Sequence, residues 1–221
     1  MECMKVYNVS VPFEKFILSK VNSIESNSLV LIPYGILNPI NFNDELVGKT
    51  SVIKDVCTFS RDKGVTVVFC VDATVNGNKF LSTVIIDDGR LLGTCDETHT
   101  LDNSVTKGGA IRVFDTSVAR LGILIDDDIY YFEAARIATL LDAEVILMFG
   151  KSGKDYGVAP RANAELNGRS GILITQDDFE IINTDHALIN DAYVFDIKLD
   201  DTYLKSRRKD IYRQLYSVIP Y

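Results

Sequence analysis

Short runs of consecutive apolar residues recur along the chain and predict strands that are covered on both faces. SLVLIP (28–33) is one such run, and VTVVFCVD (65–72) is another. Apolar runs of this length without alternation are typical of strands in the interior of a covered sheet. Further strand-like runs are MKVYNVSV (4–11), EVILMFG (144–150), GRSGILIT (168–175), FEIINT (179–184) and AYVFDIKL (192–199).

Between these runs, apolar residues recur every three or four positions, which predicts amphipathic helices. Segment 12–25 places Phe13, Phe16 and Ile24 on one helical face, and Pro12 suits a first turn. The other predicted helices are 43–64, which Gly64 ends, 130–143, and 200–218, which Asp200 or Asp201 caps.

Turn signals in the middle of the chain predict antiparallel strands. Asn76-Gly77 and Asp88-Gly89 flank a β-rich run, as in a meander of hairpins, and 110–125 resembles a further hairpin. Strands and helices that alternate, with antiparallel pairs between them, predict an α/β fold with a mixed sheet and helices on one or both faces. A length of 221 residues fits a single domain, 1–221.

The charge balance argues against a nucleic-acid partner. The chain has 23 Lys and Arg against 31 Asp and Glu, a formal net charge of −8. Proteins that bind nucleic acid need a basic face to displace counterions from phosphates. We therefore expect neither DNA nor RNA as a partner.

The four cysteines and the N-terminal sequence favour a reduced, cytoplasmic protein. MECMKVYNVS has neither the basic start nor the long apolar run of a signal peptide, and no apolar segment approaches the length of a membrane span. An even number of cysteines is only a weak sign of pairing, so we expect free thiols and no contact with a membrane. Cys70, inside VTVVFCVD, is expected to be a small core residue.

The order of several short motifs resembles the nitrilase, or carbon–nitrogen hydrolase, superfamily. Upstream, LVLIPYGIL is similar to that family's strand ending in Pro-Glu, and DDGRLLGTCDETHTL is similar to a second family segment, with His99 in place. The family's central run, a glycine, a hairpin, a strand with a nucleophilic cysteine and an F-P-E-x-x-R helix, is similar to residues 108–150. Matching residues are Gly109, Phe114, Gly122, Asp128, Phe132, Glu133, Arg136, Ala143 and Glu144, followed by Arg161, Ala162 and the G-x-S-like strand at 168–175.

This resemblance implies a four-layer α–β–β–α sandwich that self-associates through its helical layers into a homo-oligomer. It also implies a reaction centre of a glutamate base, a lysine ammonium and a cysteine nucleophile. In this sequence the three positions hold Tyr34, Glu97 and Asp126. The segment between EVILMFG and GRSGILIT is shorter than in the family, which puts an inherited substrate specificity in doubt.

The three exchanges predict a pseudoenzyme that acts as a binding or scaffolding protein. A tyrosine, with an ordinary pKa of about 10, is a poor base at neutral pH. Glu97 places negative charge where an oxyanion forms, a contact that costs roughly 4 kcal/mol at about 4 Å and an effective dielectric of about 20. The centre is thus expected to carry surplus negative charge and to lack both its thiol and its ammonium group.

The three consecutive aspartates have three interpretations. In the first, Asp128 accepts backbone N–H groups or caps the next helix, and Asp127 reaches solvent. In the second, Glu97, Asp126 and Asp128 hold Mg²⁺ or Ca²⁺, although their spacing matches no known metal loop. In the third, the carboxylates bind a cationic small molecule in a pocket. No cofactor is expected, and Asp127, Asp128, Glu133 and His99 are the candidate binding residues.

The alternative to a pseudoenzyme is a hydrolase of carbon–nitrogen bonds with a rebuilt site. Its nucleophile is Cys95, or it uses a metal ion held by Glu97, Asp126 and Asp128. Cys95 has no neighbouring histidine or lysine in sequence that obviously lowers its pKa, which favours a half-buried strand thiol. His99 is expected to form a structural hydrogen bond, and His186, in the polar turn NTDHAL, to be solvated.

Overall fold

The computed structural model describes residues 3–20 and 23–197, except for the side chains of 17–20, and its strands form two mixed sheets. In the first sheet the order is β12-β13-β1-β2-β4-β5-β6, with β3 paired to β4. Its strands are β1 (Cys3–Asn8), β2 (Leu29–Ile32), β3 (Ile40–Asn41), β4 (Thr66–Val75), β5 (Asn78–Asp87), β6 (Arg90–Asp96), β12 (His186–Ile189) and β13 (Ala192–Asp196).

The second sheet has the order β11-β10-β9-β8-β7. Its three central strands run parallel, and both edge strands are antiparallel to their neighbours. The strands are β7 (Val113–Asp115), β8 (Arg120–Ile125), β9 (Val145–Phe149), β10 (Ser170–Ile174) and β11 (Phe179–Ile182). The expected mixed α/β fold is therefore confirmed.

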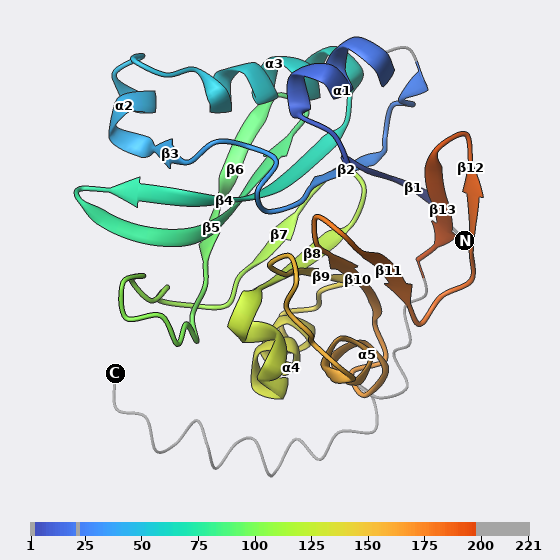
Figure 1. Ribbon diagram of the computed structural model, residues 1–221. Helices are drawn as coiled ribbons and strands as arrows, with labels where there is room; N and C mark the ends of the chain where they lie inside the picture. The colour runs from blue at the N-terminus through green and yellow to red at the C-terminus, as the bar shows by residue number, and fades with distance from the viewer. Residues whose placement is uncertain (1–2, 21–22, 198–221) are drawn as a thin grey trace.

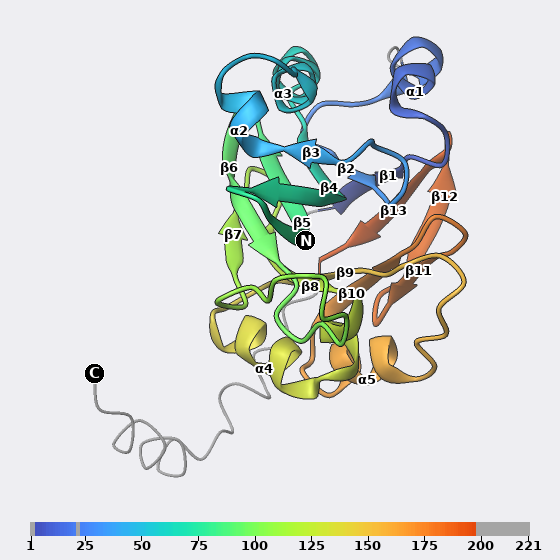
Figure 2. The same ribbon diagram turned by 60° about the vertical axis from the view of Figure 1, so that its left-hand side comes forward.

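Helices lie on the two outer sides of the paired sheets (Figures 1 and 2). One side carries α1 (Phe13–Lys20), α2 (Phe42–Leu46) and α3 (Val52–Lys63), and the other carries α4 (Phe132–Leu140) and α5 (Ala159–Glu165). No helix in these described ranges is long and apolar enough to cross a membrane.

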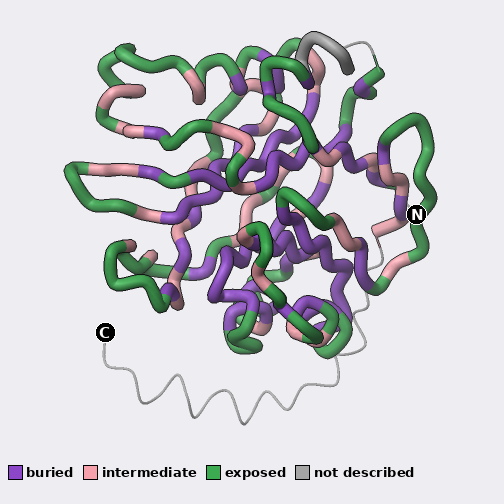
Figure 3. The backbone as a smooth tube through the Cα atoms, in the orientation of Figure 1, coloured by how far each residue is buried: buried purple, intermediate pink, exposed green. Residues whose placement is uncertain are grey.

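Strand β2, an unbroken apolar run, contributes side chains both to the core between the sheets and to the core under the helices. All four of its residues are buried, because successive side chains point to opposite faces of the sheet. Leu29 and Leu31 pack between the sheets against residues such as Leu121. Val30 and Ile32 face the layer of α1 and α3. Figure 3 shows the central strands of both sheets buried and the outer loops exposed.

The predicted meander is present and has the predicted turns. Strands β4, β5 and β6 pair antiparallel in sequence order. Asn76, Gly77, Asp88 and Gly89 all have positive φ values, between 45° and 84°, as two-residue hairpin turns of this type require. The predicted hairpin within 110–125 is likewise confirmed as β7 and β8.

Several predicted boundaries are wrong. The helix expected over 43–64 is two helices, α2 and α3, because the chain turns at Gly48 (φ 73°) and a new helix starts after Ser51. Glu45 accepts the backbone N–H groups of Val52 and Ile53 and so caps the second helix. The helix expected over 12–25 is described as α1 over Phe13–Lys20, and residues 24–25 do not belong to a helix. The predicted helix 200–218 lies outside the described residues.

Candidate functional site

The candidate site lies where three strands end. Strands β8 and β9 are parallel neighbours, with Ile125 paired to Phe149, so the residues after both strands meet at one edge of the sheet. Glu97 directly follows β6 of the other sheet. We call the side chains gathered here the ion-pair cluster: Glu97, Asp126, Asp127, Lys151, Lys154 and Tyr156.

Asp126 occupies a sharp elbow between β8 and a 3₁₀ helix, Asp126–Tyr130. Its φ of 45° lies in the left-handed region, which costs energy for a side chain other than glycine. Asp126 is only 3% exposed. A strained residue at a strand end is typical of positions where a fold presents a functional side chain.

Two ammonium groups and a phenol hold the Asp126 carboxylate. Lys154 Nζ lies 2.8 Å from Oδ1, Tyr156 donates its hydroxyl to Oδ1 at 2.6 Å, and Lys151 Nζ lies 3.1 Å from Oδ2. Burial raises the pKa of Asp126, but these three contacts outweigh it and hold the pKa below its ordinary value. Burial lowers the pKa of each lysine, and their contacts with Asp126 outweigh it and raise the pKa.

The expectation of a centre without an ammonium group is therefore wrong. Both lysines come from the loop after β9, inside the segment KSGKDYG (151–157). The carboxyl ends of parallel strands share one edge, so the position of this loop after a buried strand was the available signal. Sequence reasoning missed the lysines and Tyr156 because it looked for a replacement ammonium only at the family's lysine position.

Glu97, which the sequence resemblance aligns with the family's lysine, is fully buried. Its Oε1 accepts the backbone N–H of Asp127 at 3.0 Å. Its Oε2 has no hydrogen-bond partner among the described residues. Burial raises the pKa of Glu97 to about 7, the negative charges of Asp126 and Asp127 add to the rise, and the Asp127 N–H and Lys151 act against it.

The other two aspartates of the triplet have separate roles. Asp128, fully buried, accepts the backbone N–H groups of Thr98 and His99 and the Thr98 hydroxyl, which agrees with the first interpretation of the triplet. The expectation that Asp127 reaches solvent is wrong, because Asp127 is only 7% exposed. Its Oδ1 contacts Lys154 at 2.6 Å and its Oδ2 accepts the Leu101 N–H.

A compact group of carboxylates differs from the set expected to hold a metal. Glu97, Asp126 and Asp127 each offer an oxygen within 4.8 Å of the others. Asp128 is turned toward the backbone of residues 98–99 and is not part of this group. Three carboxylate oxygens at such distances are suited to a hard cation.

Tyr34, which the sequence resemblance aligns with the family's glutamate, follows β2 and is partly buried. Its hydroxyl donates to Asp72 Oδ2 at 2.9 Å. Burial, the hydrogen bond to Asp72 and the charges of Asp72 and Asp126 raise the pKa of Tyr34 to about 12. Tyr34 therefore remains protonated at neutral pH and does not supply a base.

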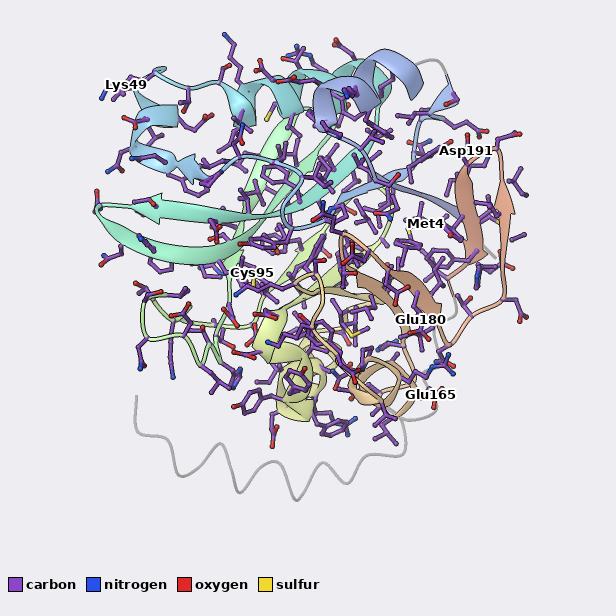
Figure 4. The ribbon with its side chains drawn as sticks, viewed as in Figure 1. Met4, Lys49, Cys95, Glu165, Glu180 and Asp191 are labelled. Atoms are coloured by element: carbon purple, nitrogen blue, oxygen red, sulfur yellow. The ribbon has the colours of Figure 1, made fainter. Side chains whose placement is uncertain are left out.

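All four cysteines are free and lie within the described residues, and none belongs to the ion-pair cluster. Cys70 and Cys95 pack in the apolar core between the sheets, which confirms Cys70 as a core residue (Figure 4 labels Cys95). Burial raises the pKa of Cys95 to about 12, so its thiol stays protonated. Cys3 is exposed, and Cys57 is half-buried on α3.

The remaining candidates are His99, Glu133 and His186. His99 adjoins the ion-pair cluster, whereas Glu133 and His186 do not. His99 Nδ1 lies 2.8 Å from Asp128 Oδ1, and the ring stacks on Tyr131 at 4.1 Å. Glu133 is exposed in the first turn of α4. His186 is exposed as expected, but it begins strand β12 and does not lie in a turn.

Comparison with known proteins identifies the family of this chain. A family model described as carbon–nitrogen hydrolase matches residues 29–195, so this chain belongs to the carbon–nitrogen hydrolase family. No curated protein matches the sequence significantly.

Solved structures of the same fold include the NitN amidase from Nesterenkonia sp. AN1. It is 14% identical with a TM-score of 0.68, over 97% of this chain and 100% of that chain. A carbon–nitrogen hydrolase from Helicobacter pylori G27 is 18% identical with a TM-score of 0.65, over 99% of each chain. A mutant of the Nesterenkonia amidase carries acrylamide added at its active-site cysteine. At these identities the likeness establishes the fold.

Proposed function

We propose that this protein is a pseudoenzyme of the carbon–nitrogen hydrolase family that serves as a binding or scaffolding subunit. The observation that carries the proposal is that Asp126, which the sequence resemblance aligns with the family's cysteine, stands at the strained elbow after β8. A carboxylate that attacks an amide must form a high-energy mixed anhydride, so it is a poor replacement for a thiolate.

The contacts of Asp126 also argue against its use as a nucleophile. Both oxygens are engaged, Oδ1 by Lys154 and Tyr156 and Oδ2 by Lys151. These contacts stabilise the carboxylate and reduce the electron density available for attack. The ammonium groups in turn are occupied by carboxylates, which leaves them poorly placed to stabilise an oxyanion.

The alternative nucleophile, Cys95, is buried in apolar surroundings that do not activate a thiol. Cys95 is 1% exposed and lies in the apolar core between the sheets. A nucleophilic thiol needs access to substrate and a lowered pKa, whereas burial raises the pKa of Cys95 to about 12. This placement supports the pseudoenzyme over a hydrolase that uses Cys95.

Ammonia release from amides, nitriles and carbamoyl compounds tests the proposal. We expect no release above that of the buffer from the wild-type protein, and no change in Asp126→Ala or Cys95→Ser. Turnover that either variant abolishes would overturn the proposal and would identify which side chain is the nucleophile.

We also infer that the layers form the family's α–β–β–α sandwich and that the α4–α5 layer binds a second copy of the chain. The two helices pack against each other and leave large apolar side chains uncovered. These side chains are Phe132, Ile137, Leu140, Leu141, Val158 and Leu166, each 37–80% exposed. An apolar face of this kind is typical of a surface that closes a symmetric dimer.

Light scattering coupled to size-exclusion chromatography tests the self-association. We expect a dimer for the wild type and a monomer for Ile137→Asp. Leu46→Asp, on α2 in the opposite helical layer, is the matched control and should remain dimeric. A monomeric wild type, or a dimeric Ile137→Asp, would contradict this part of the proposal.

A further inference from the structure

The buried Glu97 carboxylate has an oxygen that nothing in the described chain satisfies. Oε1 accepts the N–H of Asp127, but Oε2 has no hydrogen-bond partner among the described residues. Glu97 is 0% exposed, so bulk solvent does not supply that partner. A buried carboxylate oxygen without a protein partner is costly, and a bound ion or water can supply that partner.

The carboxylates beside Glu97 have the chemistry of a cation site. Glu97, Asp126 and Asp127 offer oxygens that all lie within 4.8 Å of one another. Oxygen ligands bind Mg²⁺ and Ca²⁺ at about 2.0–2.6 Å, so ligands on opposite sides of one ion are separated by about 4–5 Å. The three oxygens therefore fit around a single ion.

The charges of the cluster are compatible with a divalent cation in place of one ammonium group. Three carboxylates face two ammonium groups, so one negative charge is in excess when every one of these groups is charged. Lys154 bridges Asp126 and Asp127, while neither lysine is bonded to Glu97. If a doubly charged cation replaces the Lys154 ammonium, the charges of the cluster balance.

Lys154 is also the counterion that can leave. Its side chain is 29% exposed and follows Gly153, which has a φ of 72°. A lysine ammonium on a flexible stem can turn to solvent, where its hydration is strong. Lys151 remains on Asp126 Oδ2 in this exchange.

We propose that a hard divalent cation such as Mn²⁺, Mg²⁺ or Ca²⁺ binds between Glu97, Asp126 and Asp127 by displacing the ammonium of Lys154. The Lys154 ammonium competes with the cation for the carboxylates of Asp126 and Asp127, so removal of this ammonium must strengthen cation binding. Removal of the Glu97 charge must weaken binding. Neither expectation depends on whether the protein hydrolyses a substrate.

Titration with Mn²⁺ at pH 8, followed by electron paramagnetic resonance and calorimetry, tests the proposal. We expect saturable binding of one Mn²⁺ to the wild-type protein, at least ~10-fold tighter binding to Lys154→Met and at least ~10-fold weaker binding to Glu97→Gln. Lys49→Met is the control, because Lys49 (labelled in Figure 4) pairs with Asp44 of α2, in the opposite helical layer to α4, and it should bind like the wild type.

Three results would overturn the proposal: no saturable binding to the wild type, no gain in Lys154→Met, or unchanged binding in Glu97→Gln. Binding to Lys154→Met alone would also overturn it, because Lys154 would then be a permanent counterion. Circular dichroism checks that each variant folds. If Glu97→Gln does not fold, Asp127→Asn provides the same comparison.

Discussion

Lys154 Nζ lies 2.8 Å from Asp126 Oδ1, and this pair joins the loop after β9 to the strained elbow after β8. The same ammonium contacts Asp127 at 2.6 Å. The aromatic rings of Tyr130 and Tyr156 lie within 5.6 Å of it. Asp126, which the sequence resemblance aligns with the family's nucleophilic cysteine, is thus one half of an ion pair.

Removal of the ammonium from this pair should destabilise the fold. Lys154→Ala leaves two buried carboxylates with one fewer counterion, and we expect the free energy of unfolding to fall by about 1–3 kcal/mol. Urea unfolding at low salt measures the loss. Lys49→Ala, which breaks an exposed ion pair, should cost less than about 0.5 kcal/mol. Equal effects of the two substitutions would argue against a structural role for Lys154.

Glu97 should make the protein less stable as the pH rises toward neutrality. Its pKa in the folded state is about 7, above its ordinary value of 4.5, so folding favours the protonated carboxyl. The resulting stabilisation is fully present below about pH 4.5 and is lost as the pH rises through about 7. A difference of this size corresponds to at most about 3–4 kcal/mol.

Urea unfolding of the wild type and Glu97→Gln between pH 5 and 8.5 measures this effect. The pKa of Asp126 is lowered from 3.8, so its titration falls below this window. We expect the wild type to lose stability relative to Glu97→Gln as the pH rises. Glu133→Gln, at an exposed position on α4, should follow the wild-type curve. Parallel curves for Glu97→Gln and the wild type would contradict the expectation.

Asp128 should matter more for stability than an exposed aspartate does. Its carboxylate ties the segment after β6 to the elbow through bonds from Thr98, His99 and Ile125. Asp128→Asn removes the negative charge and places an amide NH2 group against the N–H groups that the carboxylate accepts. We expect the free energy of unfolding to fall by about 2–4 kcal/mol. Thermal unfolding measures the loss, with Asp62→Asn on the surface of α3 as control. A loss below about 0.5 kcal/mol for Asp128→Asn would refute this account of the elbow.

Gly150 allows Tyr156 to reach the cluster. A Cβ atom at Gly150 would lie 2.5–2.8 Å from the Tyr156 ring and hydroxyl, and that hydroxyl donates to Asp126. Gly150→Ala should therefore displace Tyr156 and cost about 1–3 kcal/mol. Gly109→Ala, where nothing lies within 4 Å of the added atom, is the control. Near-UV circular dichroism, which reports tyrosine packing, should change in Gly150→Ala only.

The sequence was sufficient for most of the fold because its strands are strongly marked. Unbroken apolar runs identified β2, β4, β9 and β10, and two Asx-Gly turns identified the meander. The break between α2 and α3 was missed because residues on both sides continue a helical spacing. What ends the first helix is a turn at Gly48, and what starts the second is capping by Glu45, seven residues before Val52.

The candidate site was predictable in its carboxylates but not in its counterions. Glu97 and Asp126 were candidates because the sequence resemblance aligns each of them with a catalytic residue in a short motif of the family. Lys151 and Lys154 were missed because their role depends on the parallel pairing of β8 with β9, a contact between segments some 25 residues apart. The burial of Asp127 was missed for a related reason: after the strand the chain forms a 3₁₀ helix, so side chains no longer alternate between faces.

Intact-protein mass spectrometry with an amide substrate and an acrylamide probe tests the central claim most directly. If Asp126 and its lysines have replaced the thiol chemistry, no acyl adduct forms on any residue, and acrylamide labels only the accessible thiols of Cys3 and Cys57. An acyl adduct that maps to Asp126, or rapid acrylamide labelling of Cys95 in the folded protein, would contradict the account.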